Sequence, residues 1–441
     1  MEIADYLGQT IHCECGKEHT VEIQVVEIAS GALEKVAGIL RKDGFKRPFI
    51  VSDRNTYQAA AERLISHLRE QGFVTSSHMF RTEGELVPDE ETVGELLMSF
   101  EPGCDLIIGV GSGTINDLVR FFSHRLGLPY YIAATAPSMD GYASTGAALI
   151  VNRLKTTFTC QMPRAIIADL EVLSAAPQKM IAAGFCDVVG KYTALADWRL
   201  SAIINEEYYC DRVVEMTRSS LEQTIALQDD IAKGEPGAVG KLMEALVLAG
   251  ISMSYAGNSR PASGSEHHLS HFWEMRFLLE DKPAILHGTK VGIGTVLITR
   301  LYKLLSEAGL ESESILEISY PQVETWREEI NRAFLAAAPE VIALEERTQK
   351  NAREGWEQRI KVIAERWPQI LEVLHSVPSD QEIRALLTRA GGVVNPEDVG
   401  ISSELVRDAI VYAKEVRPRY TVLQLLWDLN LLVPFAAKLV R

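Results

Sequence analysis

Hydrophobic residues change their spacing near residue 170, and this change limits the folds that the chain can adopt. Before it, short apolar runs alternate with amphipathic segments, which is typical of β-α-β units around a mostly parallel sheet. After it, the periodicity is helical and no convincing alternating strand occurs. We expect an α/β domain over residues 1–170 and an all-helical domain over residues 171–441. Because no Pro/Ser-rich linker separates the domains, they should pack closely with a cleft between them.

The expected elements of the α/β part follow one another in order. Strands are predicted at 21–28, 48–52, 76–81, 105–110 and 130–134, with helices between them at 32–42, 57–71, 90–100 and 115–123. The strand at 130–134 should close the series, and residues 147–169 should add extra strands and a loop. Helices are then predicted at 171–183, 188–204, 213–231 and 238–255, and over most of 300–440.

The charge balance limits the classes of molecule that the protein is expected to bind. The 44 basic and 60 acidic residues give a net charge of −16, which argues against nucleic acid as a partner but allows a small anionic substrate at a local positive site. Residues 1–10 lack the basic and apolar regions of a secretory signal. The longest apolar runs, 147–151 and 431–440, are too short to span a membrane. We expect a cytoplasmic protein without membrane insertion.

The six cysteines are irregularly placed, which favours thiols in a reducing compartment over a disulfide framework. Cys13 and Cys15 form a C-x-C motif with no second pair downstream. We therefore favour ordinary thiols over a metal site there.

A glycine-rich run is the candidate nucleotide site. Gly109-Val-Gly-Ser-Gly-Thr-Ile-Asn-Asp117 follows an expected strand and opens an expected helix, and a helix N-terminus offers N–H groups to a pyrophosphate. The run departs from G-x-G-x-x-G, and no acidic residue lies near position 130. Asp53 ends an earlier strand and could bind a ribose hydroxyl if that strand lies beside the turn. A tight turn without a ligand is the alternative.

A second polar loop, residues 135–144, follows the strand that ends at Ala134. Ligands of open α/β sheets bind beyond the carboxyl ends of the strands, so this loop and the glycine run should face one crevice. Asp140-Gly141 could equally be a plain turn.

Histidines cluster at a candidate metal site. Four of the 10 histidines fall within residues 267–287, and His267 and His271 share one helix face if the segment is helical. Asp187 lies upstream in Gly-Phe-Cys-Asp. Three Asp and His ligands would leave an open position, as in catalytic metal sites, whereas capping or solvent-facing histidines are the alternative.

Together, the blocks 109–117, 135–144, 184–187, 264–271 and 287–295 make the chain resemble the iron-containing alcohol dehydrogenase and dehydroquinate synthase superfamily, and within it the glycerol-1-phosphate dehydrogenases of the bacterial, arabinose-operon type. The resemblance runs from about residue 20 to 300. It implies a Rossmann-like first domain, NADH as cofactor with NADPH possible, one divalent metal (nickel, zinc or iron) and a homodimer. One departure is Val110, where many relatives have a third consecutive glycine.

The resemblance also implies roles for single residues. The metal ligands would be Asp187, His267 and His287, spaced by 80 and 20 residues, with His271 near the substrate and Asp140 contacting it. The implied dinucleotide contacts are Asp53, Gly113, Thr114, Ile115, Asn116, Asp117, Thr135, Ala136, Pro137, Ser138 and Ser144.

The implied reaction is the metal-dependent, reversible reduction of dihydroxyacetone phosphate to sn-glycerol 1-phosphate for glycerophospholipid-type synthesis. Asp187, His267, His271 and His287 would form the catalytic set, and His271 or a water would supply the proton. Arg260 and Lys290 are candidate phosphate clamps. A glycerol dehydrogenase, a dehydroquinate synthase-like lyase and a non-catalytic binding protein are the alternatives.

Overall fold

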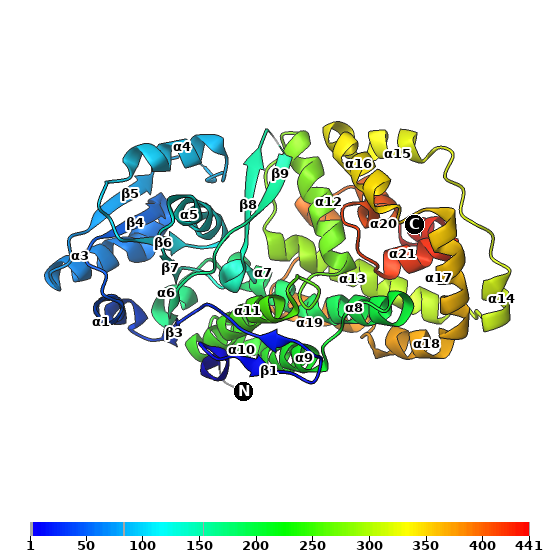
Figure 1. Ribbon diagram of the computed structural model, residues 1–441, viewed down its shortest axis with the longest axis horizontal. Coiled ribbons are helices and arrows are strands. Elements are labelled where there is room, and N and C mark those ends of the chain that lie inside the picture. The colour runs from blue at the N-terminus through cyan, green and yellow to red at the C-terminus, as the bar shows by residue number, and fades with distance from the viewer. Residues whose placement is uncertain (1–2, 83, 153, 441) are drawn as a thin grey trace. The chain divides into compact units, whose positions relative to one another are not determined.

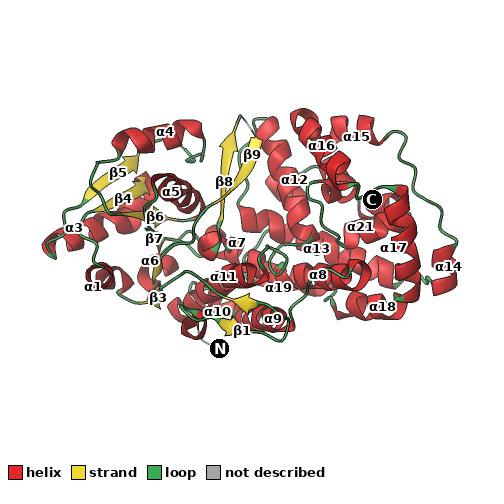
Figure 2. Cartoon of the chain, viewed as in Figure 1, coloured by secondary structure: helices red, strands yellow, loops and turns green. Residues whose placement is uncertain are grey.

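The computed structural model describes residues 3–82, 84–152 and 154–440. The chain forms two compact units, one of residues up to Val188 together with Ser219–Asn258, and one of Val189–Arg218 together with the residues from Ser259 onward. Every described strand ends at or before Asp169, and helices dominate the rest (Figures 1 and 2). The predicted fold class, a mostly parallel α/β part followed by a helical part, is confirmed. Residue 170 marks the end of the sheet, although residues 219–258 also pack in the first unit.

Six parallel strands form the sheet of the first unit, in the order β3-β10-β7-β6-β4-β5. Their bounds are β3 (Val25–Ala29), β4 (Pro48–Asp53), β5 (Ser76–Phe80), β6 (Leu106–Gly111), β7 (Tyr130–Ala134) and β10 (Ala165–Asp169). The prediction that 130–134 closes the series was wrong, because β10 pairs with both β7 and β3. The extra strands expected within residues 147–169 are confirmed: β8 (Gly146–Val151) and β9 (Leu154–Thr159) form an antiparallel hairpin, and β10 follows it.

Both faces of this sheet are covered, which explains its nearly continuous apolar strands. On one face, α1 (Ala32–Asp43) and α3 (Glu62–Glu70) pack against Ile50, Ile108 and neighbouring strand residues. On the other face, rings link the sheet to α4 (Glu90–Ser99) and α5 (Gly113–Leu126): Phe49 lies 5.3 Å from Phe100, which lies 5.7 Å from Phe122.

Several predicted helices are divided. The helix predicted at 57–71 starts earlier, with α2 (Arg54–Thr56), and runs through a π-turn (Tyr57–Ala61) into α3. The helix predicted at 171–183 is α6 (Leu170–Ser174) and α7 (Gln178–Val189), separated at Pro177, which lacks the N–H that an uninterrupted helix needs. The helix predicted at 213–231 is α9 (Asp211–Ala226) and α10 (Gln228–Ala232).

The helices of the second unit carry the predicted histidines. They include α8 (Lys191–Asn205), α12 (Ser265–Leu279), α13 (His287–Ser306), α14 (Ser312–Leu316), α15 (Trp326–Phe334), α16 (Ala338–Thr348), α17 (Arg353–Glu365), α18 (Trp367–Ser376), α19 (Asp380–Arg389), α20 (Ser403–Tyr412), α21 (Val422–Asp428) and α22 (Leu432–Leu439).

One helix of the first unit, α11 (Pro236–Ala256), is long and apolar enough to cross a membrane, and the bent pair α21–α22 passes the same test together. The tested window of α11 is 72% buried within the protein. It packs against α6, β3 and the 3-10 turn η3 (Gly141–Ala143), as the core helix of a globular unit does.

Candidate active site

The glycine turn joins β6 to α5. A Cβ atom on Gly111 would lie 2.6 Å from the Ile115 side chain, so the return of the chain into α5 requires glycine here. Ser112, the N-cap of α5, makes no capping hydrogen bond with its side chain, which suits N–H groups that receive an anion. Val110 is fully buried in β6 against the α1 and α3 face. The departure at Val110 therefore lies in the core, before the turn begins.

Strand pairing brings the two predicted loops and Asp53 to one edge of the sheet. Gly109 pairs with Val51 of β4, and Gly111 pairs with Ala134 of β7. Asp53, at the end of β4, is therefore next to the turn, as the hypothesis for a ribose contact requires. Its Oδ1 also accepts a hydrogen bond of 2.8 Å from the N–H of Thr56, which caps α2.

Two predicted dinucleotide contacts use their side chains inside the protein. Asn116 is fully buried, and its Nδ2 donates to the carbonyl of Gly141 at 3.2 Å. Asp117 pairs with Arg120 at 2.9 Å and accepts from the N–H of Ala148 at 3.3 Å. Arg120, which the sequence analysis missed, also donates to the carbonyls of residues 141, 142 and 146. We expect these side chains to position the loop.

The loop that follows β7 is fastened to the glycine turn. The N–H of Thr135 donates to the carbonyl of Gly111 at 3.1 Å, and the hydroxyl oxygens of Ser138 and Ser112 are 2.6 Å apart. The Tyr142 hydroxyl donates to the carbonyl of Ala136 at 2.6 Å. These bonds hold two chain segments that the sequence separates by 26 residues.

The remaining predicted residues of the first unit flank this loop. The N–H of Asp140 donates to Asp187 Oδ2 at 3.0 Å, and Asp187 is completely buried near the end of α7. Ser144 Oγ accepts from the N–H of Gly146 at 2.9 Å. Gly113 and Thr114 open α5, whereas the Ile115 side chain is buried, so a ligand would reach Ile115 through its backbone.

Gly184 explains the glycine of the Gly-Phe-Cys-Asp block. A Cβ at this position would lie 1.8 Å from the carbonyl oxygen of Pro137, so α7 can approach the loop only through a glycine. We expect Gly184→Ala to destabilise the protein by about 3 kcal/mol or more and to weaken NADH binding, because a backbone group must move. Urea unfolding and NADH fluorescence titration measure both effects.

Gly38→Ala is the matched control, because Gly38 is an exposed residue of α1, and a Cβ added to it would have no other atom within 4 Å. It should stabilise the protein by about 0.5–1 kcal/mol. Equal stability of the Gly184→Ala protein and the parent would contradict the close packing.

Three of the predicted histidines come together in the second unit. The rings of His267 and His287 are 5.1 Å apart, and the His271 ring lies 6.2 Å and 6.1 Å from them. His267 and His271 lie one turn apart on α12, as predicted, and His287 opens α13. A Cβ on Gly294 would lie 2.7 Å from the carbonyl oxygen of Glu266, so glycine lets α13 approach α12.

Glu266, which the sequence analysis missed, orients the first of these histidines. Its Oε1 lies 2.7 Å from His267 Nδ1 and accepts the Nδ1 proton, which leaves Nε2 as the atom for a metal. Thr193 Oγ1 donates to the other oxygen at 2.5 Å. Burial raises the pKa of Glu266, but the hydrogen bonds from His267 and Thr193 outweigh burial and hold this pKa below its ordinary value. The buried carboxylate is therefore ionised.

The two predicted phosphate clamps are already engaged. Arg260 binds Glu207, with Nε 2.8 Å from Oε1, and donates to the carbonyl of Tyr420 at 2.7 Å. Lys290 Nζ lies 3.3 Å from Glu274 Oε1. Both cations are thus compensated by carboxylates, which makes them weak candidates for binding a further anion.

A different group of cations lacks carboxylate partners. Among the described residues, no ion pair joins Arg417 or Arg419 to an acid, and Arg419 Nη1 donates to the carbonyl of Ser263 at 3.4 Å, just before α12. Burial lowers the pKa of Arg417, and burial with the nearby Arg417 and Arg260 charges lowers the pKa of Arg419 to about 9. These residues lie outside the blocks that carried the resemblance.

His268 belongs to the same neighbourhood. It is fully buried, and both its ring nitrogens lack a hydrogen-bond partner within the described part of the chain. Burial, together with the charges of Arg419, Arg417 and Lys350, holds the pKa of His268 well below its ordinary value. Within the described residues, this imidazole has no hydrogen-bond partner and the two guanidinium groups have no ion-paired acid, an arrangement suited to an anionic ligand.

The chain is similar to a known family and to curated enzymes. A family model described as iron-containing alcohol dehydrogenase matches residues 27–177. The curated NAD(P)+ glycerol-1-phosphate dehydrogenase of Halalkalibacterium halodurans is 34% identical over 93% of this chain and 94% of its own length. That of Bacillus subtilis is 32% identical over 93% of each chain.

Solved structures show the same fold at low identity. Glycerol dehydrogenase from Schizosaccharomyces pombe is 15% identical, with a TM-score of 0.59 over 94% of this chain and 90% of that one. Maleylacetate reductase from Rhizobium sp. strain MTP-10005 is 13% identical, with a TM-score of 0.56 over 98% of each chain.

Proposed function

Because the chain belongs to the iron-containing alcohol dehydrogenase family, and within it to the glycerol-1-phosphate dehydrogenases, we propose that it reduces dihydroxyacetone phosphate to sn-glycerol 1-phosphate with NAD(P)H, reversibly. The relatives from Halalkalibacterium halodurans and Bacillus subtilis, which bear this name, align over more than nine-tenths of both chains. The choice of a phosphorylated substrate rests on three residues, His268, Arg417 and Arg419. Among the described residues, none of the three forms an ion pair with a carboxylate, so they could bind a phosphate group.

His267 and His287, with Asp187 as the third ligand, would hold one divalent metal. The fit rests on two observations. Glu266 accepts the Nδ1 proton of His267, so His267 Nε2 keeps its lone pair for a metal, and the two imidazole rings lie 5.1 Å apart. A metal bound there supplies Lewis acidity toward the oxygen of the reacting carbonyl or alcohol. Imidazole and carboxylate ligands suit nickel, zinc or iron.

The edge of the sheet would bind the dinucleotide. The first N–H groups of α5 would receive the pyrophosphate, and Asp53 would lie at the ribose. Since a carboxylate repels a 2′-phosphate, we propose a preference for NADH over NADPH. The bound nicotinamide supplies the hydride.

His271 would exchange the proton with the substrate oxygen. Its ring lies 6.1 Å from that of His287, and its Nδ1 is 3.6 Å from Glu274 Oε2, so a carboxylate is at hand when the ring becomes charged. An imidazole exchanges protons near neutral pH, which suits general acid–base work. His268, Arg417 and Arg419 would bind the phosphate group.

A substrate panel tests this proposal. We expect NADH oxidation with dihydroxyacetone phosphate to exceed that with dihydroxyacetone by at least about a hundredfold in kcat/KM, since two charged contacts contribute about 3 kcal/mol or more together. Chelation should abolish turnover, and readdition of a divalent metal should restore it. Equal turnover of dihydroxyacetone would favour a glycerol dehydrogenase, and turnover without NAD(P)H would favour a lyase.

We also propose that the enzyme is a cytoplasmic homodimer serving glycerophospholipid-type synthesis. The resemblance of the chain to its family supports these points. Light scattering of the purified protein tests the dimer, and a monomeric mass would contradict it.

A further inference from the structure

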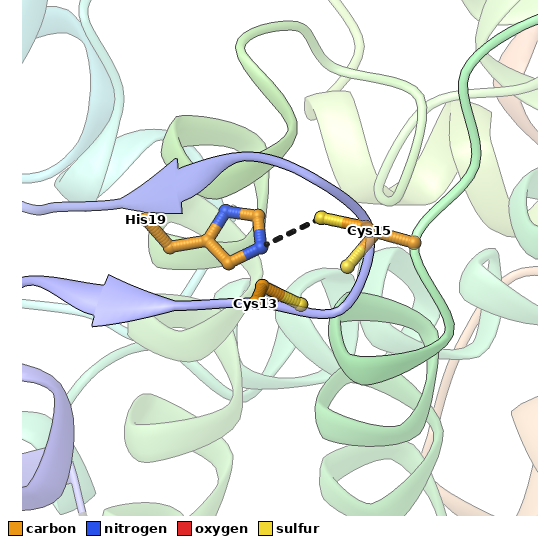
Figure 3. A group of neighbouring side chains, drawn as sticks. Cys13, Cys15 and His19 are labelled. Atoms are coloured by element: carbon orange, nitrogen blue, oxygen red, sulfur yellow. Dashed lines mark hydrogen bonds between the residues drawn. The ribbon is translucent and has the colours of Figure 1, made fainter.

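A short hairpin near the N-terminus gathers two cysteines and a histidine (Figure 3). Strands β1 (Ile11–His12) and β2 (Glu18–His19) pair antiparallel, and the turn between them contains Cys13 and Cys15. The N–H of Cys13 donates to the carbonyl of Lys17 at 3.2 Å, and the N–H of Gly16 donates to the carbonyl of Cys13 at 3.0 Å. Gly16 has φ of +83°, a conformation that favours glycine. The motif is thus C-x-C-G-x-x-H on a closed turn.

His19 is held so that one ring nitrogen faces the thiols. Its Nδ1 lies 3.0 Å from the carbonyl oxygen of Tyr255, at the end of α11, and its ring stacks on that tyrosine at 5.0 Å. A carbonyl only accepts, so Nδ1 carries the proton and Nε2 keeps its lone pair. Nε2 lies 3.4 Å from Cys15 Sγ. Metal-binding histidines are commonly oriented by this kind of carbonyl contact.

The separations fit one small ion. The three ligand atoms, the two Sγ atoms and one imidazole nitrogen, lie within 4.8 Å of one another. Tetrahedral zinc with Zn–S bonds of about 2.3 Å needs ligand atoms about 3.5 to 3.8 Å apart. Both thiols are only partly buried, so rotation of their side chains closes the remaining difference.

We propose that Cys13, Cys15 and His19 bind a zinc ion at a site separate from that of His267 and His287. Two thiolates and an imidazole form a soft ligand set that favours zinc over the harder cations. The fourth position goes to a water or to a ligand outside the hairpin.

The site would fasten the N-terminal segment to α11. His19 and Tyr255 already join the two, and Ser254 Oγ donates to the carbonyl of Thr20 at 3.3 Å. Earlier in α11, a Cβ on Gly250 would lie 2.6 Å from that of Ala143 in η3. The ion would therefore stabilise the helix that supports the loop after β7, without touching substrate.

Cobalt substitution tests the site in the full-length protein. Cobalt-loaded wild-type protein should show near-ultraviolet thiolate charge-transfer absorption, which the Asp and His ligands of the other site cannot produce. The band should disappear in the Cys13→Ser/Cys15→Ser double variant, and zinc content should fall by about one equivalent per chain. His287→Ala should keep the band, because this variant disrupts the Asp and His site and leaves both cysteines in place.

Glu14→Ala, an exposed substitution between the two cysteines, is the matched control and should keep both the band and the zinc. Because the double variant could unfold, the wild-type spectrum and zinc-dependent protection of thiols from Ellman's reagent are measured as well. No thiolate band in folded wild-type protein, or an unchanged band in a folded double variant, would overturn the proposal whatever the substrate panel shows.

Discussion

His287→Ala is expected to remove the proposed catalytic metal and to lower kcat/KM for dihydroxyacetone phosphate by at least about a thousandfold. The estimate follows from the several kcal/mol that Lewis-acid stabilisation contributes at the transition state. His287 is preferable to His267 for this test, because its removal leaves the buried Glu266–His267 hydrogen bond of 2.7 Å intact. Metal analysis and steady-state kinetics, before and after readdition of metal, measure the loss.

His375→Ala, which removes an exposed histidine of α18, is the control and should behave as wild type. Full activity and full metal content in His287→Ala would remove His287 from the site.

Asp187→Asn isolates the charge of the proposed third ligand. The amide oxygen can still accept from the N–H of Asp140, a bond of 3.0 Å in the parent, so the loop should stay in place. We expect metal affinity to fall by at least about a hundredfold, because a neutral amide oxygen is a much weaker ligand for a divalent cation than a carboxylate. Unchanged metal affinity would show that Asp187 supports the loop only.

Arg419→Met is expected to lower kcat/KM for phosphorylated substrates and to leave kcat/KM for unphosphorylated substrates nearly unchanged. Loss of one charge-assisted hydrogen bond to phosphate costs about 1.5–3 kcal/mol, so kcat/KM for sn-glycerol 1-phosphate should fall roughly tenfold to 150-fold. The kcat/KM for glycerol should change little, because glycerol lacks the group that the guanidinium would bind. Arg417→Met should act in the same direction.

The control for these two variants is Arg353→Met, on the exposed start of α17, where Arg353 pairs with Glu357 at 3.0 Å. It should leave both substrates unaffected. If Arg419→Met lowers kcat/KM equally for glycerol and glycerol 1-phosphate, Arg419 stabilises the second unit and does not recognise phosphate. Thermal unfolding of each variant separates that outcome from a loss of fold.

Much of the α/β part was predictable because each strand carries its own signal. Strands β4, β6 and β7 are apolar runs bounded by polar turns, and their predicted bounds agree within one residue. The order of strands was not predictable in this way. Strand β10 inserts between β3 and β7 through contacts with segments more than 30 residues away, and local periodicity contains no information about such pairing.

In the candidate site, too, the features that depend on local spacing were predictable and those that depend on tertiary contacts were not. Sequence spacing alone predicted that His267 and His271 share a helix face, and motif order pointed to the glycine turn and to His287. The chain pattern assigned the phosphate to Arg260 and Lys290, but the folded protein neutralises both with acids, Glu207 and Glu274. The C-x-C motif at Cys13 seemed ordinary because its third partner, His19, becomes relevant only when the turn closes and Tyr255 orients the ring.

The sequence by itself determined the class of fold, the polar loops that follow the strands and the residues of the histidine cluster, because these depend on short-range spacing along a strand or a helix. Tertiary structure decided which charges remain without a carboxylate partner. Arg419 lies 151 positions after His268 in the chain, and it reaches the start of α12 only through packing of the later helices. Compensation of buried charge depends on such distant neighbours, so it is a property of the folded chain.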